Sequence, residues 1–274
     1  METGLRGKTA LITGGSSGIG KGIALALAGE GVDLAIASRH PDPAAIAELQ
    51  AQGVRCIAIE ADVSREADVV AMVAKAIAEF GHLDIYVNDA AWTWHQPVTQ
   101  IDSDSWYRTL NTNLSACMWA CREVGRHMIA HRSGSILIVG STVRFNPSYR
   151  ETSYRVSKEG LRMYMQDLAI ELAPYGIRVN MVTPGHFRTR MTSTVPEATE
   201  RKMLELIPAH RFGDPIEIGN VACLLLSDRL SGYIIGADLV VDGGLTLRPL
   251  PLFTAEQIEA MNQSDAAATC GDAR

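Results

Sequence analysis

Lysine is scarce in this chain of 274 residues, where arginine supplies most of the 25 cationic side chains. The lysines are Lys8, Lys21, Lys75, Lys158 and Lys202. The formal net charge of −6 argues against nucleic acid or an anionic membrane as partner, since both favour a cationic surface. No apolar run reaches transmembrane length, and none of signal-peptide length precedes the first glycines. We therefore expect a cytoplasmic protein without a membrane anchor.

Cysteine patterns that would indicate disulfides or zinc are missing. The five cysteines are Cys56, Cys117, Cys121, Cys223 and Cys270, an odd number without a CxxC pair. Cys117 and Cys121 lie four residues apart on a predicted helix, where packing is favoured over a redox pair. The histidines are interpreted as lacking metal-ligand spacing, so no metal is expected.

Short apolar segments alternate with longer segments of helical period, a pattern typical of an α/β fold. The predicted strands span residues 9–13, 34–38, 55–60, 85–88, 135–139, 178–183 and 238–241. The predicted helices lie near residues 18–30, 66–80, 103–131, 154–174 and 215–227. This order predicts a single Rossmann-type, doubly wound domain, with a seven-stranded parallel sheet and helices on both faces. Ligands are expected at the carboxyl ends of the strands.

One domain is expected over residues 1–248, followed by a tail at 249–274. Within the domain, residues 184–213 contain three prolines and no strand pattern. We interpret them as an insertion with one short helix, forming a lid over the substrate. The tail either docks on a neighbouring subunit or stays mobile, and its composition fits both.

A glycine-rich turn, TGGSSGIG at residues 13–20, follows the first predicted strand and precedes the first helix. Glycines allow a sharp turn close to a pyrophosphate, and the helix N-terminus supplies free N–H groups. We therefore expect a dinucleotide here, with an ordinary loop as the alternative. The expected contacts are Gly14, Ser16, Ser17, Gly18, Ile19 and Gly20.

The end of the second strand carries no carboxylate for the ribose 2′-hydroxyl of NAD. Arg39 lies there instead, and the first acidic residue is Asp42. The fork of Arg39 suits a 2′-phosphate, which favours NADP(H). In the alternative, Arg39 is solvated and Asp42 or a backbone group holds NAD. Asp62 and Val63, after the third strand, are expected near the adenine.

Tyr154 and Lys158 are four residues apart at the start of a predicted helix and so share one face. A phenol is a weak acid at neutral pH, but a fixed ammonium and a cationic nicotinamide stabilise its phenolate. Ser141 ends the fifth strand, where its hydroxyl is placed to bind a substrate oxygen; a turn serine is the alternative. Asn113 is interpreted as holding a water linked to Lys158, and Asn88 as tying the sheet edge to nearby loops.

The chain resembles the short-chain dehydrogenase/reductase family from about residue 7 to residue 246. The motifs that carry the resemblance are TGGSSGIG, Asp62, NDAA at 88–91, Asn113, Ser141, YRVSK at 154–158, RVNMVTPG at 178–185, Thr189 and VDGG at 241–244. The resemblance implies a catalytic tetrad of Asn113, Ser141, Tyr154 and Lys158, with Lys158 also on the nicotinamide ribose. It places Asn88, Ala90, Pro184, Gly185 and Thr189 near the cofactor. It also implies a homotetramer or homodimer built from helices 103–131 and 154–174.

The sequence departs from the family pattern after the fourth strand. The usual NNAG is Asn88-Asp89-Ala90-Ala91 here, which adds a carboxylate and a methyl group where the backbone passes the cofactor. We expect a modest adjustment of cofactor geometry rather than lost binding.

Loops flanking the tetrad are rich in polar and cationic residues. They contain Arg144, Asn146, Tyr149, Arg150, His186, Arg188 and Arg190, beside Trp92 and Trp94. If several point inward, the substrate is a small polar carbonyl or alcohol such as a sugar, polyol or oxo-acid; otherwise they form a solvated face. A 3-oxoacyl thioester reductase is the enzymatic alternative. A non-catalytic dinucleotide sensor or scaffold is the alternative of another class, disfavoured because Ser141, Tyr154 and Lys158 are all present.

Overall fold

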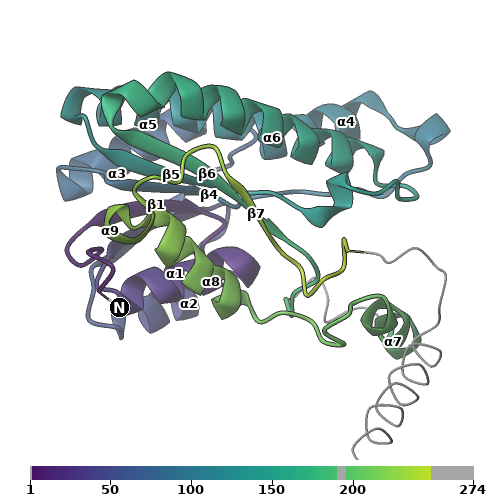
Figure 1. Ribbon diagram of the computed structural model, residues 1–274. Coiled ribbons are helices and arrows are strands. Elements are labelled where there is room, and N and C mark those ends of the chain that lie inside the picture. Colours follow the sequence, from purple (N-terminus) through teal and green to yellow (C-terminus); the bar gives the residue numbers. More distant parts are fainter. Residues whose placement is uncertain (1, 190–195, 248–274) are drawn as a thin grey trace, which may run out of the picture.

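A computed structural model describes residues 2–189 and 196–247. All seven strands run parallel in one sheet of order β3-β2-β1-β4-β5-β6-β7 (Figure 1). The strands are β1 Thr9–Thr13, β2 Asp33–Ser38, β3 Cys56–Glu60, β4 Ile85–Asn88, β5 Gly134–Val139, β6 Ile177–Pro184 and β7 Asp238–Val241. Every strand residue of β1, β4 and β6 is buried, as expected for a parallel sheet covered on both faces. The predicted doubly wound α/β fold is confirmed.

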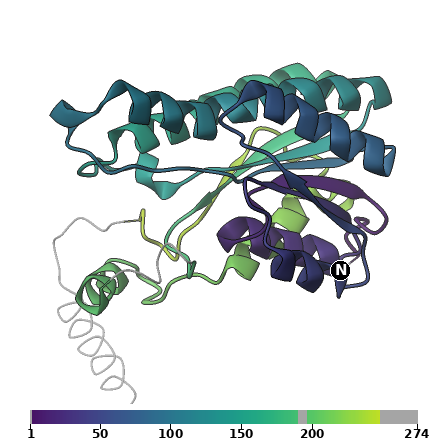
Figure 2. The same cartoon turned by 180° about the vertical axis from the view of Figure 1, so that it is seen from behind.

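Helices cover both faces of the sheet. On one face lie α3 Glu66–Phe80, α4 Ser103–Leu110, α5 Ala116–His131 and α6 Thr152–Leu172. On the other lie α1 Gly18–Gly29, α2 Pro43–Gln50, α8 Pro215–Leu226 and α9 Asp228–Ser231. Figure 2 shows the same two layers from behind. The two hydrophobic clusters of the core correspond to these two interfaces.

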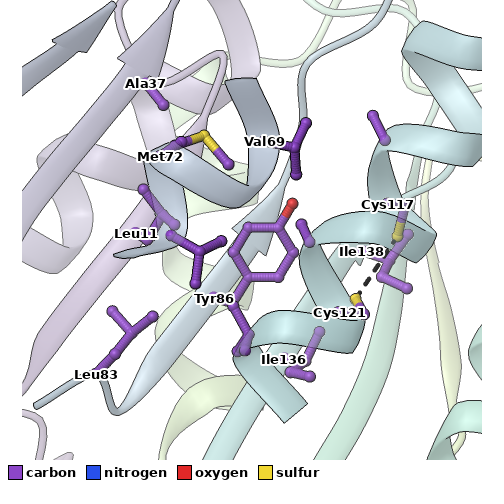
Figure 3. Close-up of a cluster of buried hydrophobic side chains, with 14 of the residues drawn as sticks. Leu11, Ala37, Val69, Met72, Leu83, Tyr86, Cys117, Cys121, Ile136 and Ile138 are labelled. Atoms are coloured by element: carbon purple, nitrogen blue, oxygen red, sulfur yellow. Dashed lines mark hydrogen bonds between the residues drawn. The ribbon is translucent and has the colours of Figure 1, made fainter. Parts of the chain in front are cut away.

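The cluster beneath α3, α5 and α6 surrounds the fully buried side chain of Tyr86 (Figure 3). Cys117 and Cys121 pack there with their sulfur atoms 3.9 Å apart. The hydrogen bond with Cys117, together with burial, holds the pKa of the Cys121 thiol well above its usual range. Both residues are buried packing groups, and the raised pKa of Cys121 keeps its thiol protonated.

Two helical features differ from the sequence prediction. The segment 103–131 is interrupted by a π-helix at Asn111–Ser115, in which Ala116 N–H bonds to the carbonyl of Asn111. Helix α2 was not predicted. It begins after Asp42, whose carboxylate accepts a hydrogen bond from Ala44 N at 3.0 Å, and Pro43 occupies the first turn.

The insertion predicted at 184–213 has a closed stem. Phe187 and Gly213 form an isolated β-bridge, and Arg188 N donates to Gly213 O at 2.9 Å. The described residues of this stretch include the helix α7 Glu197–Glu205, which stands apart from the sheet in Figure 1. Arg190 and the tail 249–274 lie outside the described residues. None of the helices described is both long and apolar enough to traverse a lipid bilayer.

Candidate active site

The carboxyl ends of β1 and β4 are joined by Thr13, a residue that the sequence analysis did not single out. Its hydroxyl accepts hydrogen bonds from Asp89 N at 3.2 Å and Ala90 N at 3.3 Å. Asn88 is buried and accepts a hydrogen bond from the Tyr86 hydroxyl at 3.0 Å. The backbone leaving β4 is therefore fixed against the glycine-rich turn.

The glycine-rich turn is too tight for other residues at two positions. Gly14 has a φ of 76°, in the left-handed region, and a Cβ on Gly20 would lie 2.5 Å from Gly14 O. Ser17, the N-cap of α1, forms no side-chain capping bond, while Ile19 packs partly on the core. Backbone N–H groups at the start of α1 are thus presented as in a pyrophosphate site, and the turn fits a dinucleotide.

Asp89 places a carboxylate against this turn. Its Oδ2 lies within 3.2 Å of the Cβ position of Gly14, and its carboxylate accepts a hydrogen bond from the Gly20 backbone. Burial raises the pKa of Asp89 to about 6, although Lys158 and the Gly20 hydrogen bond favour the ionised form. The desolvation penalty therefore outweighs two favourable contacts, so the ionised carboxylate of Asp89 destabilises the folded protein.

We expect Asp89→Asn to raise the free energy of unfolding at pH 8. The folded-state pKa of Asp89 lies above the ordinary value of 3.8, so the folded protein binds more protons than the unfolded chain between about pH 4 and pH 6. Stability is lost as the pH rises through that window, and the amide removes the loss. Urea unfolding at pH 5 and pH 8 measures it, with the exposed Asp167→Asn as control. If the stability difference between Asp89→Asn and wild type is no larger at pH 8 than at pH 5, the raised pKa of Asp89 is contradicted.

Tyr154 and Lys158 meet at the carboxyl end of β5. Lys158 is only 2% exposed, and its Nζ donates to Val139 O at 2.9 Å. The same Nζ lies 5.7 Å from the ring centroid of Tyr154, which is half-buried. Ser141 follows two residues after Val139 and accepts a hydrogen bond from Val143 N at 3.3 Å. The hydroxyl of Ser141 and the Tyr154–Lys158 pair are therefore anchored to one strand end.

Asn113 reaches this group through Ser157, another residue that the sequence analysis missed. Asn113 Nδ2 donates to Ser157 Oγ at 3.0 Å and to Trp92 O at 2.9 Å, and its Oδ1 accepts from Trp92 N at 2.7 Å. Ser157 Oγ donates to Tyr154 O at 2.7 Å. Both amide hydrogens are used within the protein, so the side chain positions the loop after β4 and the Tyr154 turn. The expected water contact stays a prediction.

The residues expected at the adenine end of the cofactor have different environments in the structure. Arg39 is exposed after β2, whereas Asp42 caps α2. Asp62 accepts hydrogen bonds from Ser64 N at 3.0 Å and Ser64 Oγ at 2.7 Å. Burial favours the neutral form of Asp62, but the Ser64 bonds and the nearby Arg39 outweigh it and lower its pKa. The side chain of Val63 packs in the core.

The start of the predicted lid lies against the start of α1. Pro184 ends β6, and Gly185 N donates to Val241 O at 2.9 Å. The Cβ position of Gly18 is 3.5 Å from Thr189 Cγ2. An open cleft of about 620 Å³ is lined by Gly18, Lys21, Gly22, Leu25, Arg188, Thr189, Glu200, Phe212, Asp214, Pro215 and Ile216. The cleft thus lies between two segments that are expected to contact the cofactor, the glycine-rich turn and the residues around Thr189.

Three arginines of the loops that flank the tetrad have partners within the protein. The side chain of Arg144 is 8% exposed, forms an ion pair with Asp238 and lies 3.6 Å from Glu159. Arg188 lies 3.7 Å from Glu200, and Arg150 donates to His95 O at 3.4 Å. Arg144 is therefore not an inward-pointing cation free to meet a substrate, because the carboxylates of Asp238 and Glu159 lie beside it.

The flanking loops also contribute two stacked indole rings and a histidine. The rings of Trp92 and Trp94 are stacked with an interplanar angle of 3° and centroids 6.0 Å apart, and the Arg108 guanidinium lies 4.5 Å over Trp92. Burial lowers the pKa of His186, which favours its neutral imidazole. Asn146 and Tyr149 are exposed.

Comparison with known proteins matches these features to one family. Residues 14–246 match the family model described as enoyl-(acyl carrier protein) reductase. The chain is 37% identical to a 3-oxoacyl-(acyl-carrier-protein) reductase of Chlamydia pneumoniae over 248 residues, covering 90% of this chain and all of that protein. It is 33% identical to glucose 1-dehydrogenase 2 of Bacillus subtilis over 259 residues, covering 92% of this chain and all of that protein.

Solved structures agree with the sequence relatives. A candidate gluconate dehydrogenase from Agrobacterium tumefaciens superposes with a TM-score of 0.85 at 30% identity, covering 91% of this chain and 100% of that one. A short-chain type dehydrogenase/reductase from Mycobacterium marinum gives 0.83 at 33% identity, covering 90% and 98%. The matched sequence, the sheet order and the glycine-rich turn lead to one assignment: the chain belongs to the short-chain dehydrogenase/reductase family, whose members are oxidoreductases that generally use NAD or NADP.

Proposed function

We propose that this protein is an NADP(H)-dependent enzyme that interconverts a carbonyl and a secondary alcohol, or a sugar hemiacetal, on a small polar substrate. The observation that carries the proposal is the position of Lys158, buried between Val139 O and the ring of Tyr154. A buried ammonium with this placement stabilises negative charge on the phenol oxygen. A non-catalytic sensor could use Lys158 to bind the ribose, but it would not need a group that stabilises a phenolate.

Each residue has a defined task in this reaction. A bound nicotinamide would supply or accept the hydride. The Tyr154 hydroxyl gives its proton to the substrate oxygen during reduction and takes it back during oxidation. Lys158 stabilises the phenolate and, by resemblance to the family, binds the ribose. Ser141 holds the substrate oxygen so that its carbon faces the ring. Asn113 and Ser157 fix the backbone that carries Tyr154.

We favour a sugar or polyol over an oxo-acid as substrate. Arg144 is neutralised by Asp238, and His186 is held towards its neutral form, so these groups supply little charge for a carboxylate. The flat rings of Trp92 and Trp94 suit the C–H face of a sugar. Two relatives have names that refer to glucose and gluconate, while the Chlamydia pneumoniae protein is named for a 3-oxoacyl thioester.

A kinetic panel tests the proposal. Aldoses and polyols are offered with NADP⁺ and NAD⁺, and oxo-acids and a 3-oxoacyl thioester with the reduced cofactors. Absorbance of the reduced nicotinamide is followed. We expect the highest kcat/KM for a sugar or polyol with NADP⁺. A higher value for the thioester would establish the alternative reductase, and cofactor binding without any turnover across the panel would favour the sensor.

NADP preference is proposed from Arg39, exposed at the end of β2 with Asp42 committed to capping α2. We expect Arg39→Ala to weaken NADPH binding by roughly 10- to 100-fold, since a charge-assisted bond to the 2′-phosphate is lost. NADH binding is expected to change little. Fluorescence titration of both cofactors measures this, with the exposed Arg65→Ala as control. Equal losses for the two cofactors would refute the preference.

We also propose a homodimer or homotetramer in the cytoplasm. Val156, Met163 and Ile170 recur at seven-residue intervals on α6 and are 44%, 50% and 75% exposed, so they form an apolar stripe along one of the two long helices. Light scattering is expected to give a mass above that of one chain. The cysteines in the described ranges are unpaired, which suits a reducing compartment.

A further inference from the structure

Three histidines meet at the edge of the sheet opposite the tetrad. His82 lies in the turn between α3 and β4, and His127 and His131 lie in the last turns of α5. One ring nitrogen of each lies within 4.8 Å of one from each of the others. The ring centroids are 4.3 Å apart for His127 and His131, 4.6 Å for His82 and His131, and 5.1 Å for His82 and His127.

The spacing of two of these residues escaped the sequence analysis. His127 and His131 are separated by four positions on one helix and share a face, as do the two zinc-binding histidines of a helical HExxH motif. The third residue, His82, is distant in sequence and is brought to them by the packing of α3 against α5. Only the fold reveals a group of three.

One ring is oriented by a hydrogen bond, and a second lies against a carboxylate. His131 Nδ1 lies 2.8 Å from His127 O, and a carbonyl only accepts, so Nδ1 carries the proton and Nε2 the lone pair. His82 Nε2 lies 3.4 Å from Asp84 Oδ1, which leaves Nδ1 as the ligand atom. Asp84 is itself fixed, because its Oδ2 accepts from Thr9 N at 2.9 Å. A carboxylate or carbonyl behind the imidazole is the usual support of a metal-bound histidine.

His127 is the least prepared of the three. Its Nε2 accepts a hydrogen bond from Leu83 N at 3.1 Å, so coordination through that atom replaces the bond. Tetrahedral zinc, with Zn–N bonds near 2.0–2.1 Å, needs ligand atoms roughly 3.3 Å apart. The rings must therefore draw together, and His131, which is exposed, has the freedom to move.

We propose that His82, His127 and His131 form a binding site for one Zn²⁺ or a similar divalent transition-metal ion that prefers imidazole, with a fourth position open to water. Such an ion would link the end of α5 to the turn that precedes β4. The site lies at the amino ends of the strands, away from the Tyr154 hydroxyl. Its role is therefore structural, and it adds to the proposed function without depending on it.

The test uses full-length protein without an affinity tag, stripped with a chelator and titrated with ZnCl₂ by calorimetry. We expect one ion per chain, with a dissociation constant of micromolar order or tighter, and a raised melting temperature. His82→Ala and His131→Ala are each expected to weaken binding by at least about 10- to 100-fold, the loss that even supporting residues cause. His210→Asn, an exposed histidine with a φ of 52°, is the matched control.

The visible absorption spectrum of bound Co²⁺ gives a second readout, which a change in stability alone would not alter. The apoprotein with Co²⁺ is expected to show a visible d–d spectrum of low-symmetry coordination, absent in His131→Ala. Wild-type binding no tighter than that of His131→Ala, or a stoichiometry far from one, would overturn the proposal and leave the cluster as ring packing. Tyr154→Phe retains all three histidines and is expected to bind the ion normally, so this proposal and the enzymatic one fail separately.

Discussion

Tyr154→Phe is expected to lower kcat by roughly 100- to 10,000-fold, the range that removal of a positioned acid or base produces. Phenylalanine keeps the ring and its packing but has no proton to exchange with the substrate oxygen. Cofactor affinity is expected to change only a few-fold, because Lys158 keeps its bond to Val139 O. Stopped-flow measurement of nicotinamide absorbance with the best substrate of the panel gives kcat, and a fluorescence titration gives the affinity.

Tyr149→Phe is the matched control for this experiment. Tyr149 lies five residues earlier and is 95% exposed, so the same oxygen atom is removed from a side chain that lies in solvent. We expect wild-type kcat from this variant. If both Tyr154→Phe and Tyr149→Phe retain most of the wild-type activity, Tyr154 is not the acid/base and the proposed mechanism fails.

Lys158→Met is expected to lower kcat/KM by about 100-fold or more, comparable to the loss of one preorganised electrostatic group. Methionine fills a similar volume but removes the ammonium beside Tyr154. Because the same ammonium is expected on the ribose, the KM for the cofactor should also rise, unlike in Tyr154→Phe. Initial rates over a matrix of cofactor and substrate concentrations separate the two effects.

Lys75→Met is the control, since Lys75 is exposed on α3, a different helix from the one that carries Tyr154 and Lys158. We expect it to be indistinguishable from wild type. If Lys158→Met changes only the cofactor KM and leaves kcat intact, then Lys158 is a binding residue alone and another group must stabilise the phenolate.

Much of the fold was predictable because parallel strands buried on both faces leave a clear trace in the sequence. The predicted strand bounds agree with β1 to β7 to within one residue at each end. The Tyr154–Lys158 pair was equally accessible, since four residues on a helix bring two side chains onto one face. Both inferences depend on local periodicity and need no knowledge of distant contacts.

The parts that could not be predicted depend on long-range contacts. The π-helix at Asn111–Ser115 occurs where Asn113 bonds to Trp92 and Ser157, and a helical pattern contains no sign of it. Arg144 is polar and lies in a flanking loop, yet its carboxylate partner, Asp238, is 94 residues away. Helix α2 is different: Asp42 followed by Pro43 is a readable start signal that was interpreted only in terms of the cofactor.

The sheet order has a consequence for how the chain acquires its structure. β1 pairs with β2 on one side and with β4 on the other, where Thr13 lies opposite Asn88. During synthesis, the backbone N–H and C=O groups on this side of β1 therefore have no partner until β4 has emerged, and an unpaired strand edge is prone to associate with other chains. Pairing β1 with β4 closes a long loop of chain, which costs entropy. Slow refolding and a dependence on chaperones at high protein concentration are therefore expected.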